Sequence, residues 1–218
     1  MAQKSLVLVG MGPGNGRAIA ERFGKEGYSL GLISRSADRL RVQAEELTAS
    51  GFRVAHKTAD SINLDELVQA ITELEADLHP IDTLVFNAYG AAPELPSMLA
   101  PRQLVSDLTV NAAAPLAAAQ AVLPGMRARQ TGAILFTGGG LAMFPTMHAA
   151  SLSIGKAAIR SLTFLLNEEL KPERIRAGTV TIAGAVGTDI EASRVAEAFW
   201  GLSQDRSGDM APEVVLKP

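Results

Sequence analysis

Short apolar runs alternate with longer amphipathic stretches along the whole chain. Most of the apolar runs have four to seven residues and little polar alternation, which is typical of strands buried on both faces of a parallel sheet. The predicted strands are Ser5–Val9, Ser29–Ile33, Arg53–Thr58, Thr83–Asn87, Ala133–Thr137, Arg176–Ile182 and Glu213–Leu216. The amphipathic stretches predict helices at about Gly16–Lys25, Ala37–Ser50, Leu64–Leu78, Arg102–Arg129, Ala149–Leu170 and Asp189–Leu202.

The regular exchange of strands and helices favours right-handed β-α-β crossovers. It therefore predicts a doubly wound α/β fold, with a parallel sheet of about seven strands flanked by helices. No repeat, low-complexity tract or linker divides the sequence, so we expect a single domain over residues 1–218. Pro115 and Pro124 lie within the stretch Arg102–Arg129 and predict that it kinks or splits into two helices.

The composition excludes several classes of function. Twenty Lys and Arg against 23 Asp and Glu leave a net charge of −3, so neither nucleic acid nor an anionic membrane is an expected partner. Cysteine is absent, and His56, His79 and His148 lack metal-ligand spacing, so no metal site is expected. No apolar run approaches the ~20 residues of a membrane span, and the first apolar segment is too short for a signal peptide. These features predict a cytoplasmic protein.

Four glycines at alternate positions separate the first predicted strand from the first helix. Gly10, Gly12, Gly14 and Gly16 permit a tight turn and let a pyrophosphate approach the backbone and the helix N-terminus. One interpretation is a tight turn and nothing more, because such a motif alone is a weak signal. Its place in the first β-α unit of an alternating chain favours a dinucleotide site, and with it a Rossmann fold.

Several further segments have the spacing of one enzyme family. They are Gly10-x-x-x-Gly14-x-Gly16, Asn87-Ala88-Tyr89-Gly90, Thr109-Val110-Asn111, Ser153–Ala158 and Ala183–Thr188. On these motifs the sequence resembles the short-chain dehydrogenase/reductase family over nearly its whole length. Two motifs depart from the family pattern, since the N-A-G motif has one residue inserted or changed at Tyr89 and alanine replaces proline in the last segment. The resemblance implies a nicotinamide cofactor and a carbonyl/alcohol substrate pair, with Asn111 and Lys156 in the active site.

The end of the second predicted strand bears on the choice of dinucleotide. An acid in this place binds the ribose hydroxyls of NAD, whereas a guanidinium accommodates the 2′-phosphate of NADP. Ser34, Arg35 and Ser36 therefore favour NADP over NAD. A second interpretation is that Ser36 caps the next helix and Arg35 is a solvated surface residue. Asp60 and Ser61 resemble the place where the family contacts adenine, although they also suit a helix cap.

The turn, the arginine and the family motifs together define a predicted cofactor site. Its residues are Gly10, Gly12, Gly14, Asn15, Gly16, Ser34, Arg35, Ser36, Asp60, Ser61, Asn87, Ala88, Tyr89, Lys156, Gly184, Val186 and Thr188.

Two side chains that handle protons in the family are missing from this sequence. The family tyrosine precedes the lysine by four residues, and four residues before Lys156 is Leu152. The family serine follows the fifth strand, where this sequence has Gly139. General acid–base catalysis contributes ~10²–10⁴-fold and one oxyanion donor ~10²–10³-fold. Ordinary carbonyl reduction should therefore be much weakened, and whether the protein is an enzyme stays open.

Other side chains could replace the missing tyrosine. His148 lies four residues before Leu152 and shares a helix face with Leu152 and Lys156 if the helix begins that early. A histidine with a pKa near ~6.5 can donate a proton at neutral pH. The alternative is that His148 is a polar residue near the helix start. Tyr89 could reach a substrate with its hydroxyl, or pack as an ordinary aromatic residue.

Two hypotheses follow. The first is an NADP(H)-binding oxidoreductase with a non-standard active site and an unidentified small-molecule substrate. The second is a catalytically silent NADP(H)-binding protein that acts as a sensor or a subunit partner. The small-residue segments Ala112–Ala121 and Ala157–Leu170 resemble the family's association surfaces and predict a homodimer or homotetramer. The other interpretation is that these alanine-rich faces pack on their own sheet.

Overall fold

The computed structural model describes residues 3–78, 80–205 and 210–218, so His79 lies outside the described residues. The strands are β1 (Ser5–Val9), β2 (Ser29–Ser34), β3 (Val54–Thr58), β4 (Ile81–Phe86), β5 (Gly132–Gly139), β6 (Ile175–Ile182) and β7 (Glu213–Leu216). The α-helices are α1 (Asn15–Lys25), α2 (Ala37–Ala49), α3 (Leu64–Leu78), α4 (Pro101–Leu108), α5 (Ala114–Arg129), α6 (Ala150–Leu170) and α7 (Ala192–Gln204).

All seven strands form one parallel sheet in the order β3-β2-β1-β4-β5-β6-β7. The predicted doubly wound α/β fold is confirmed. The strand order reverses between β1 and β4, where Leu8 pairs with Leu32 of β2 on one side and with Val85 of β4 on the other. In such sheets this reversal opens a crevice at the carboxyl ends of the strands, where ligands bind.

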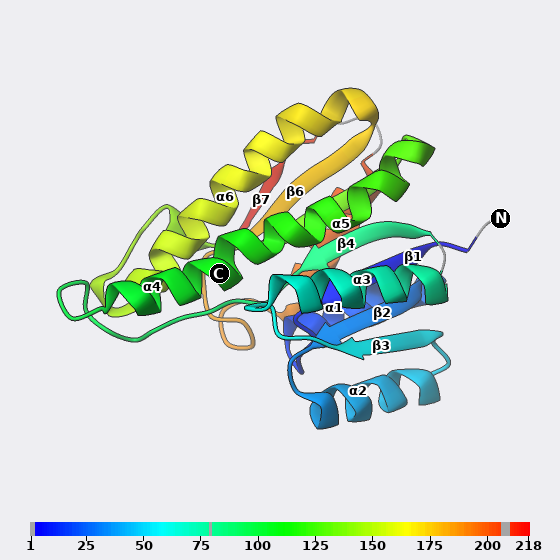
Figure 1. Cartoon of the computed structure of the whole chain (residues 1–218), viewed down its shortest axis with the longest axis horizontal. Coiled ribbons are helices and arrows are strands. Elements are labelled where there is room, and N and C mark those ends of the chain that lie inside the picture. The colour runs from blue at the N-terminus through cyan, green and yellow to red at the C-terminus, as the bar shows by residue number, and fades with distance from the viewer. Residues whose placement is uncertain (1–2, 79, 206–209) are drawn as a thin grey trace.

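Successive residues of the central strand point to opposite faces of the sheet and enter two separate cores. Leu6 and Leu8 of β1 pack with apolar residues of α1, α2 and α7. Val7 and Val9 pack with residues of α3, α5 and α6, which lie in front of the sheet in Figure 1. All four side chains are nearly inaccessible to solvent, which explains why the strand has no polar alternation.

The segment predicted to kink at its prolines forms two helices joined by a π-helical turn, Thr109–Ala113. Pro115 lies in the first turn of α5, directly after this π-helical turn. Pro124 stays inside α5. The predicted split is thus present, but it lies upstream of Pro115, and α4 and α5 follow one another as a long helix (Figure 1).

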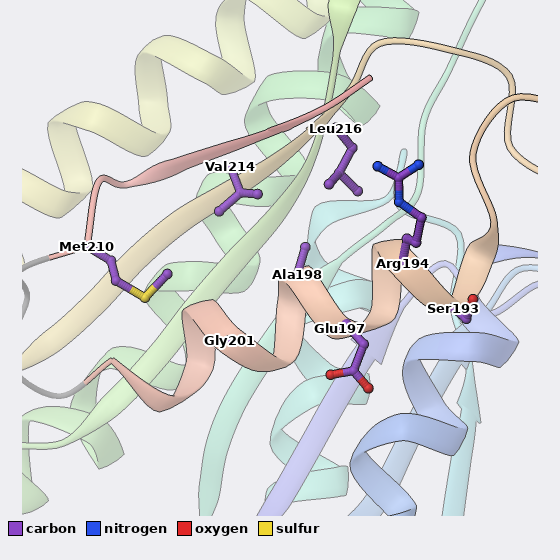
Figure 2. Close-up of a pocket in the computed structure, with 8 residues that line it drawn as sticks. All are labelled: Ser193, Arg194, Glu197, Ala198, Gly201, Met210, Val214 and Leu216. Carbon is purple, nitrogen blue, oxygen red and sulfur yellow. The ribbon is translucent and has the colours of Figure 1, made fainter. Parts of the chain in front are cut away.

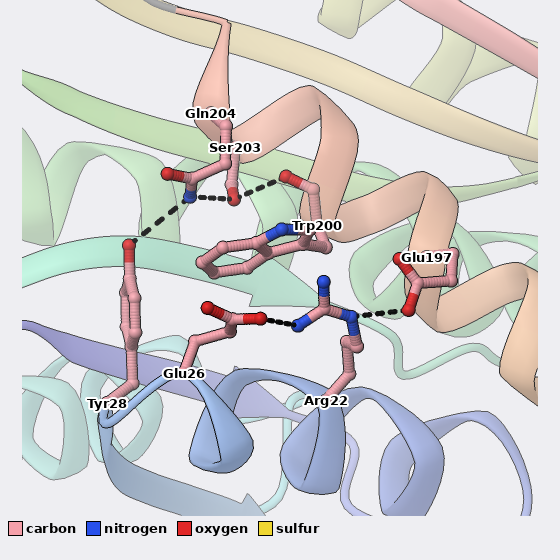
Figure 3. Close-up of polar contacts among 7 residues, drawn as sticks. All are labelled: Arg22, Glu26, Tyr28, Glu197, Trp200, Ser203 and Gln204. Atoms are coloured by element: carbon pink, nitrogen blue, oxygen red, sulfur yellow. Dashed lines mark hydrogen bonds and ion pairs between the residues drawn. The ribbon is translucent and has the colours of Figure 1, made fainter.

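Helix α7 packs on α1 through charged and aromatic side chains (Figure 3). Arg22 of α1 pairs with both Glu26 and Glu197, and its guanidinium lies 4.6 Å from the ring centre of Trp200. Trp200 also meets Tyr28 edge to face, with ring centres 5.7 Å apart. Exposed ion pairs contribute little to stability, so the aromatic contacts contribute most of the stability that the packing of α7 on α1 provides.

Among the described residues, one helical stretch, Met147–Glu173, is long and apolar enough to cross a bilayer by length and composition alone. Of its apolar window, 44% is buried inside the fold. Ile159, Leu166 and Leu170 belong to the core beneath α6. Packing on the sheet accounts for this apolar face.

Candidate active site

A cleft of about 1420 Å³ follows the carboxyl ends of the strands across the β1–β4 reversal. The segments that line it come from the loops after β1, β2, β3, β4, β5 and β6, together with α4 and α6. Most residues of the predicted cofactor site line this cleft, although they are spread over more than 170 positions of the sequence.

The glycine turn after β1 forms one end of the cleft. Gly10 has φ of +89°, and a Cβ there would lie 2.4 Å from the backbone nitrogen of Ala88, so no other residue fits. A Cβ on Gly12 or Gly14 would meet nothing within 4 Å, because both face the open cleft. Asn15 at the start of α1 has a buried Oδ1 without a hydrogen-bond partner among the described residues. This open cradle at a helix N-terminus fits a pyrophosphate.

Two arginines face the cleft beyond the glycine turn. Arg35 is exposed and lines the cleft, as the sequence predicted. Ser36 occupies the N-cap position of α2 but makes no capping hydrogen bond, and its hydroxyl accepts one from Arg39 Nε at 3.1 Å. Arg39 also lines the cleft and was missed from the sequence. Arg39 could have been predicted because it follows Arg35 by one helical turn and so lies on the same side of the chain.

Asp60 and Ser61 line the cleft where β3 ends, beside Ile62. The carboxylate of Asp60 accepts a hydrogen bond from the backbone N–H of Ile62 at 3.1 Å. Helix α3 is capped by Asn63, whose Oδ1 accepts from the backbone N–H of Glu66 at 3.3 Å. Asn63, and not Asp60 or Ser61, therefore caps helix α3.

Lys156 lies at the opposite end of the cleft. Its side chain is buried, with 9% of the residue exposed, and its Nζ donates to the backbone oxygen of Thr137 at 2.7 Å. Burial lowers the pKa of the Lys156 ammonium to about 8, because the charged form loses its hydration. The ring of Tyr89, which is 63% exposed, has its centre 5.9 Å from Nζ.

Gly139 and Leu152 line the cleft beside this lysine. A Cβ on Gly139 would lie 3.2–3.4 Å from Cγ, Cδ and Cε of Lys156, so the lysine stem occupies the space next to the glycine. Leu152 is half-buried one helical turn before Lys156 on α6. Neither residue offers a hydroxyl to a ligand in this part of the cleft.

Asn111 does not line the cleft but holds one of its walls. It is 3% exposed and lies in the π-helical turn. Its Oδ1 accepts from the backbone N–H of Gly90 at 3.0 Å, and its Nδ2 donates to the Gly90 oxygen at 2.7 Å. Ser151 Oγ accepts from the backbone N–H of Ala92 at 3.0 Å. These three hydrogen bonds fix the loop that carries Tyr89.

Asn87 connects the two ends of the cleft. Its Nδ2 donates to the Gly10 oxygen at 2.9 Å, and its Oδ1 accepts from Thr137 Oγ1 at 2.8 Å. Since the Thr137 oxygen accepts from Lys156, the glycine turn and the lysine are joined through one asparagine and one threonine.

Besides Asn111, three predicted site residues, His148, Val186 and Thr188, lie outside the cleft lining. Helix α6 begins at Ala150, and His148 is exposed in a 3₁₀ turn before it, so His148 does not share a helix face with Lys156. Val186 and Thr188 belong to a turn closed by the backbone N–H of Ala185, which donates to Asp189 Oδ2 at 2.8 Å. Gly184 in the same segment does line the cleft. Roles for His148, Val186 and Thr188 stay predictions.

The structure adds an acid that the sequence did not point out. Asp107 of α4 is 5% exposed, lines the cleft and accepts a hydrogen bond from Gln103 Nε2 at 3.0 Å. Asp107 lies one turn before Asn111 in the sequence. A carboxylate on a helix face that is expected to be buried is unusual, and this could have identified Asp107 as a site residue. The described residues contain no cluster of His, Asp and Glu that could hold a metal ion.

A second, smaller pocket of about 490 Å³ lies between α7 and β7 (Figure 2) and shares no residue with the cleft. Its floor is mainly apolar, and its charged side chains, Arg194 and Glu197, come from α7. This pocket is therefore separate from the cleft that contains the glycine turn and Lys156.

A family model for short chain dehydrogenases matches residues 4–198. This chain belongs to the short chain dehydrogenase family. That membership agrees with the resemblance carried by the glycine turn, Asn111 and Lys156.

Two curated relatives illustrate the range of similar proteins. A short chain dehydrogenase of Pseudocercospora fijiensis is 31% identical over 173 residues, which are 77% of this chain and 55% of that protein. The very-long-chain 3-oxoacyl-CoA reductase of Coccidioides immitis is 29% identical over 175 residues, 78% of this chain and 50% of that protein. The chain spans about half the length of the curated relatives that it matches.

Solved structures share the fold over almost the whole chain. A metagenomic short-chain oxidoreductase in complex with NADP has a TM-score of 0.88 at 24% identity, covering 99% of this chain and 96% of the other. An acetoin dehydrogenase from Salmonella typhimurium has a TM-score of 0.89 at 19% identity, covering 98% and 94%. At these identities the likeness supports the fold.

Proposed function

We propose that this protein is an NADP(H)-dependent oxidoreductase of the short chain dehydrogenase type that acts on a carbonyl/alcohol pair through a non-standard active site. The observation that carries the proposal is a single cleft that joins an open glycine cradle to a buried lysine. Family membership supports the reaction class.

The preference for NADP over NAD rests on charge at the cradle end. Arg35 and Arg39 both line the cleft, and guanidinium groups bind phosphate in a bidentate manner. Asp38 is exposed on α2 and does not line the cleft, whereas Asp60 lines it but its carboxylate binds its own loop. Titration calorimetry should therefore show tighter binding of NADPH than of NADH, and equal affinities would contradict the preference.

The chain's residues have distinct tasks in this proposal. A bound nicotinamide cofactor supplies a hydride to a carbonyl carbon. Gly12 and Gly14 leave room for the pyrophosphate, and Lys156 marks the reactive end of the cleft. Leu152 and Gly139 contribute neither a proton nor a hydrogen bond. Since acid–base catalysis is worth ~10²–10⁴-fold, turnover by positioning alone should be slow.

The absence of hydroxyls at Gly139 and Leu152 favours a second candidate, a silent NADP(H)-binding sensor or subunit partner. One experiment separates the two. NADPH binding is measured first, and NADPH oxidation is then followed by stopped flow with a panel of aldehydes, ketones and diketones. Lys156-dependent oxidation supports the enzyme. Tight binding without any oxidation supports the sensor.

The lining near Lys156 bears on the substrate. Leu141, Phe144 and Leu152 give this part of the cleft an apolar wall. An apolar carbonyl compound fits that wall better than a sugar or an organic acid. The relatives include proteins named as a 3-oxoacyl-CoA reductase and a 17-beta-hydroxysteroid dehydrogenase, whose names describe carbonyl chemistry on large apolar molecules.

Self-association is proposed through α6, where Ile154, Phe164 and Leu165 are exposed. Exposed apolar side chains on one helix are typical of a contact surface. Analytical ultracentrifugation should show a dimer or tetramer, and a monomer at all concentrations would contradict the proposal.

A further inference from the structure

Asp107 presents a buried carboxylate to the cleft. The residue is 5% exposed and lines the cleft from α4. Its Oδ1 accepts a hydrogen bond from Gln103 Nε2 at 3.0 Å. Its Oδ2 is buried and has no hydrogen-bond partner among the described residues, and no described cation forms an ion pair with it. An ionised carboxylate accepts about four hydrogen bonds, so most of its capacity is unused.

An unpaired buried carboxylate indicates a missing partner. Burial removes its hydration, and buried polar groups in proteins offset that loss through hydrogen bonds to protein, water, an ion or a ligand. In the described part of the chain no group of His, Asp and Glu could hold a metal ion beside it. Rotation about χ2 exchanges the two carboxylate oxygens. One acceptor of Asp107 is therefore left for a molecule in the cleft.

The surroundings of Asp107 restrain its position. A Cβ on Gly90 would lie 3.2 Å from Oδ1 and 3.3 Å from Cα of Asp107, so glycine lets the loop after β4 lie against the acid. One helical turn later, Asn111 binds both the N–H and the oxygen of Gly90. Gln103 restrains the same carboxylate from the preceding turn. A ligand would meet an acceptor that is already positioned, which lowers the entropic cost of the contact.

Asp107 belongs to a mixed polar and apolar face of α4. The residues of this helix and of the following turn that line the cleft are Gln103, Ser106, Asp107 and Val110. Their spacing of three, one and three positions places them on one helix face. The face offers an amide, a hydroxyl, a carboxylate and a branched apolar side chain. Such a set suits a flat heterocycle, with apolar contact to the ring and hydrogen bonds at its edge.

The cofactor of the proposed function contains such a heterocycle, its adenine. In that proposal Arg35 and Arg39 serve the 2′-phosphate, Gly12 and Gly14 leave room for the pyrophosphate, and Lys156 marks the reactive end. The adenine base is the part that still lacks a polar partner. It carries an exocyclic amino group with two N–H donors, which complements a carboxylate.

Asp60 and Asp107 are the two acids among the described residues that line the cleft. The resemblance to the family suggests adenine contacts at Asp60 and Ser61. However, Asp60 accepts a hydrogen bond from the backbone N–H of Ile62 at 3.1 Å, so its carboxylate is oriented by its own loop. Oδ2 of Asp107 has no such donor among the described residues. Asp107 is therefore the acid with an acceptor to spare.

We propose that Asp107 accepts a hydrogen bond from the exocyclic amino group of the cofactor's adenine and so selects an adenine dinucleotide over one with a 6-oxo purine. The inference rests on the proposed NADP(H)-dependent function. A 6-oxo purine presents an oxygen where adenine presents an amino group, so two acceptors would face each other. A buried acceptor that loses its donor stays unpaired, and this penalty makes such recognition selective.

The first test needs no variant. Reduced nicotinamide hypoxanthine dinucleotide phosphate differs from NADPH at the purine, where an oxygen replaces the amino group. Titration calorimetry should show that the native protein binds NADPH ~10–100-fold more tightly than this analogue, the equivalent of one charge-assisted hydrogen bond. Equal affinities for the two dinucleotides would overturn the proposal.

The second test assigns the preference to one side chain. Asp107→Asn keeps an acceptor for Gln103 and can turn an amide N–H toward a 6-oxo group, so the preference for NADPH should fall to about 3-fold or less. Asp65→Asn changes an exposed acid of α3 outside the cleft lining and should keep the native preference. Both ligands are compared on the same variant, so a general loss of stability would lower both affinities and leave their ratio unchanged.

Asp60→Asn is the rival variant. The proposal is overturned if Asp60→Asn removes the preference and Asp107→Asn keeps it, because the amino group then lies at Asp60. It is also overturned if Asp107→Asn changes only the KM of the carbonyl substrate, because the carboxylate then binds the substrate. Failure of the native protein to bind NADPH would instead remove the proposed function itself, so the binding measurement distinguishes the two failures.

Discussion

The two ends of the cleft, the glycine turn after β1 and the surroundings of Lys156, are constrained in different ways. At the cradle end the first glycine is enforced by the backbone, since Gly10 has φ of +89° and no space for a Cβ. At the reactive end Gly139 and Leu152 carry no hydroxyl, and the stem of Lys156 fills the space beside Gly139. Backbone-enforced positions cannot change without loss of the fold, whereas side chains that only do chemistry can be replaced.

Packing at the reactive end accommodates Gly139. Gly138 and Gly139 belong to β5 and pair with Thr181 and Ile182 of β6. The stem of Lys156 fills the space beside Gly139. Glycine at position 139 therefore leaves no gap beside the lysine.

The largest expected effect breaks the cradle end. Gly10→Ala places a Cβ 2.4 Å from the Ala88 nitrogen in a left-handed conformation. We expect a loss of about 2–5 kcal/mol in the free energy of unfolding, from backbone strain and overpacking together. Urea denaturation measures it. Gly12→Ala is the matched control, since its Cβ meets nothing within 4 Å. That variant should stay within ~1 kcal/mol of native stability while binding NADPH more weakly. Equal stability of both variants would contradict the contrast.

The second largest effect tests the charge at the same end of the cleft, at Arg35. Arg35→Asp removes a guanidinium and adds an acid where the 2′-phosphate is expected. NADPH binding should weaken ~10–100-fold, the equivalent of one charge-assisted hydrogen bond, and NADH should become the tighter ligand. Calorimetric titration with both dinucleotides is the measurement. Arg102→Asp, at the exposed start of α4, makes the same charge change away from the cleft lining and should preserve the native order.

A smaller effect repairs the reactive end. Gly139→Ser with Leu152→Tyr introduces the two side chains that the family resemblance predicts at these positions, although the serine Cβ needs the Lys156 stem to shift by a few tenths of an ångström. We expect about a 10-fold gain in NADPH-dependent reduction of small aldehydes and diketones, above either single variant. The gain should vanish with Lys156→Ala in the same background, because the lysine charge favours ionisation of the introduced phenol. A folded double variant that binds NADPH without Lys156-dependent turnover would show that the whole pocket has diverged.

The smallest expected effect concerns His148. As a proton donor it would account for ~10²-fold of turnover. Its exposed position in the turn before α6, outside the cleft lining, predicts instead that His148→Ala changes neither turnover nor NADPH affinity. A large loss of turnover in this variant would place the histidine in the active site of the working protein.

Much of the fold could be predicted from local pattern. The bounds of β1 and β7 agree with the prediction, while β5 extends two residues beyond Thr137 through glycines that do not favour strands. Pairing with β6 extends β5 over Gly138 and Gly139. Glycine is needed at position 138 because the side chains of Thr179 and Thr181 occupy the place of a Cβ. Tertiary contact overrides propensity at that point. The π-helical turn that places Asn111 had no signal in the apolar pattern.

The sequence by itself determined the glycine cradle and the absence of hydroxyls at Gly139 and Leu152, because both depend on residue type at given positions. The tertiary structure decided which side chains share the cleft, bringing in Arg39 and Asp107 and leaving out His148. It also decided the state of Lys156, whose pKa near 8 comes from burial by elements distant in sequence. Burial and contact depend on what surrounds a side chain, and no local pattern of residues contains that information.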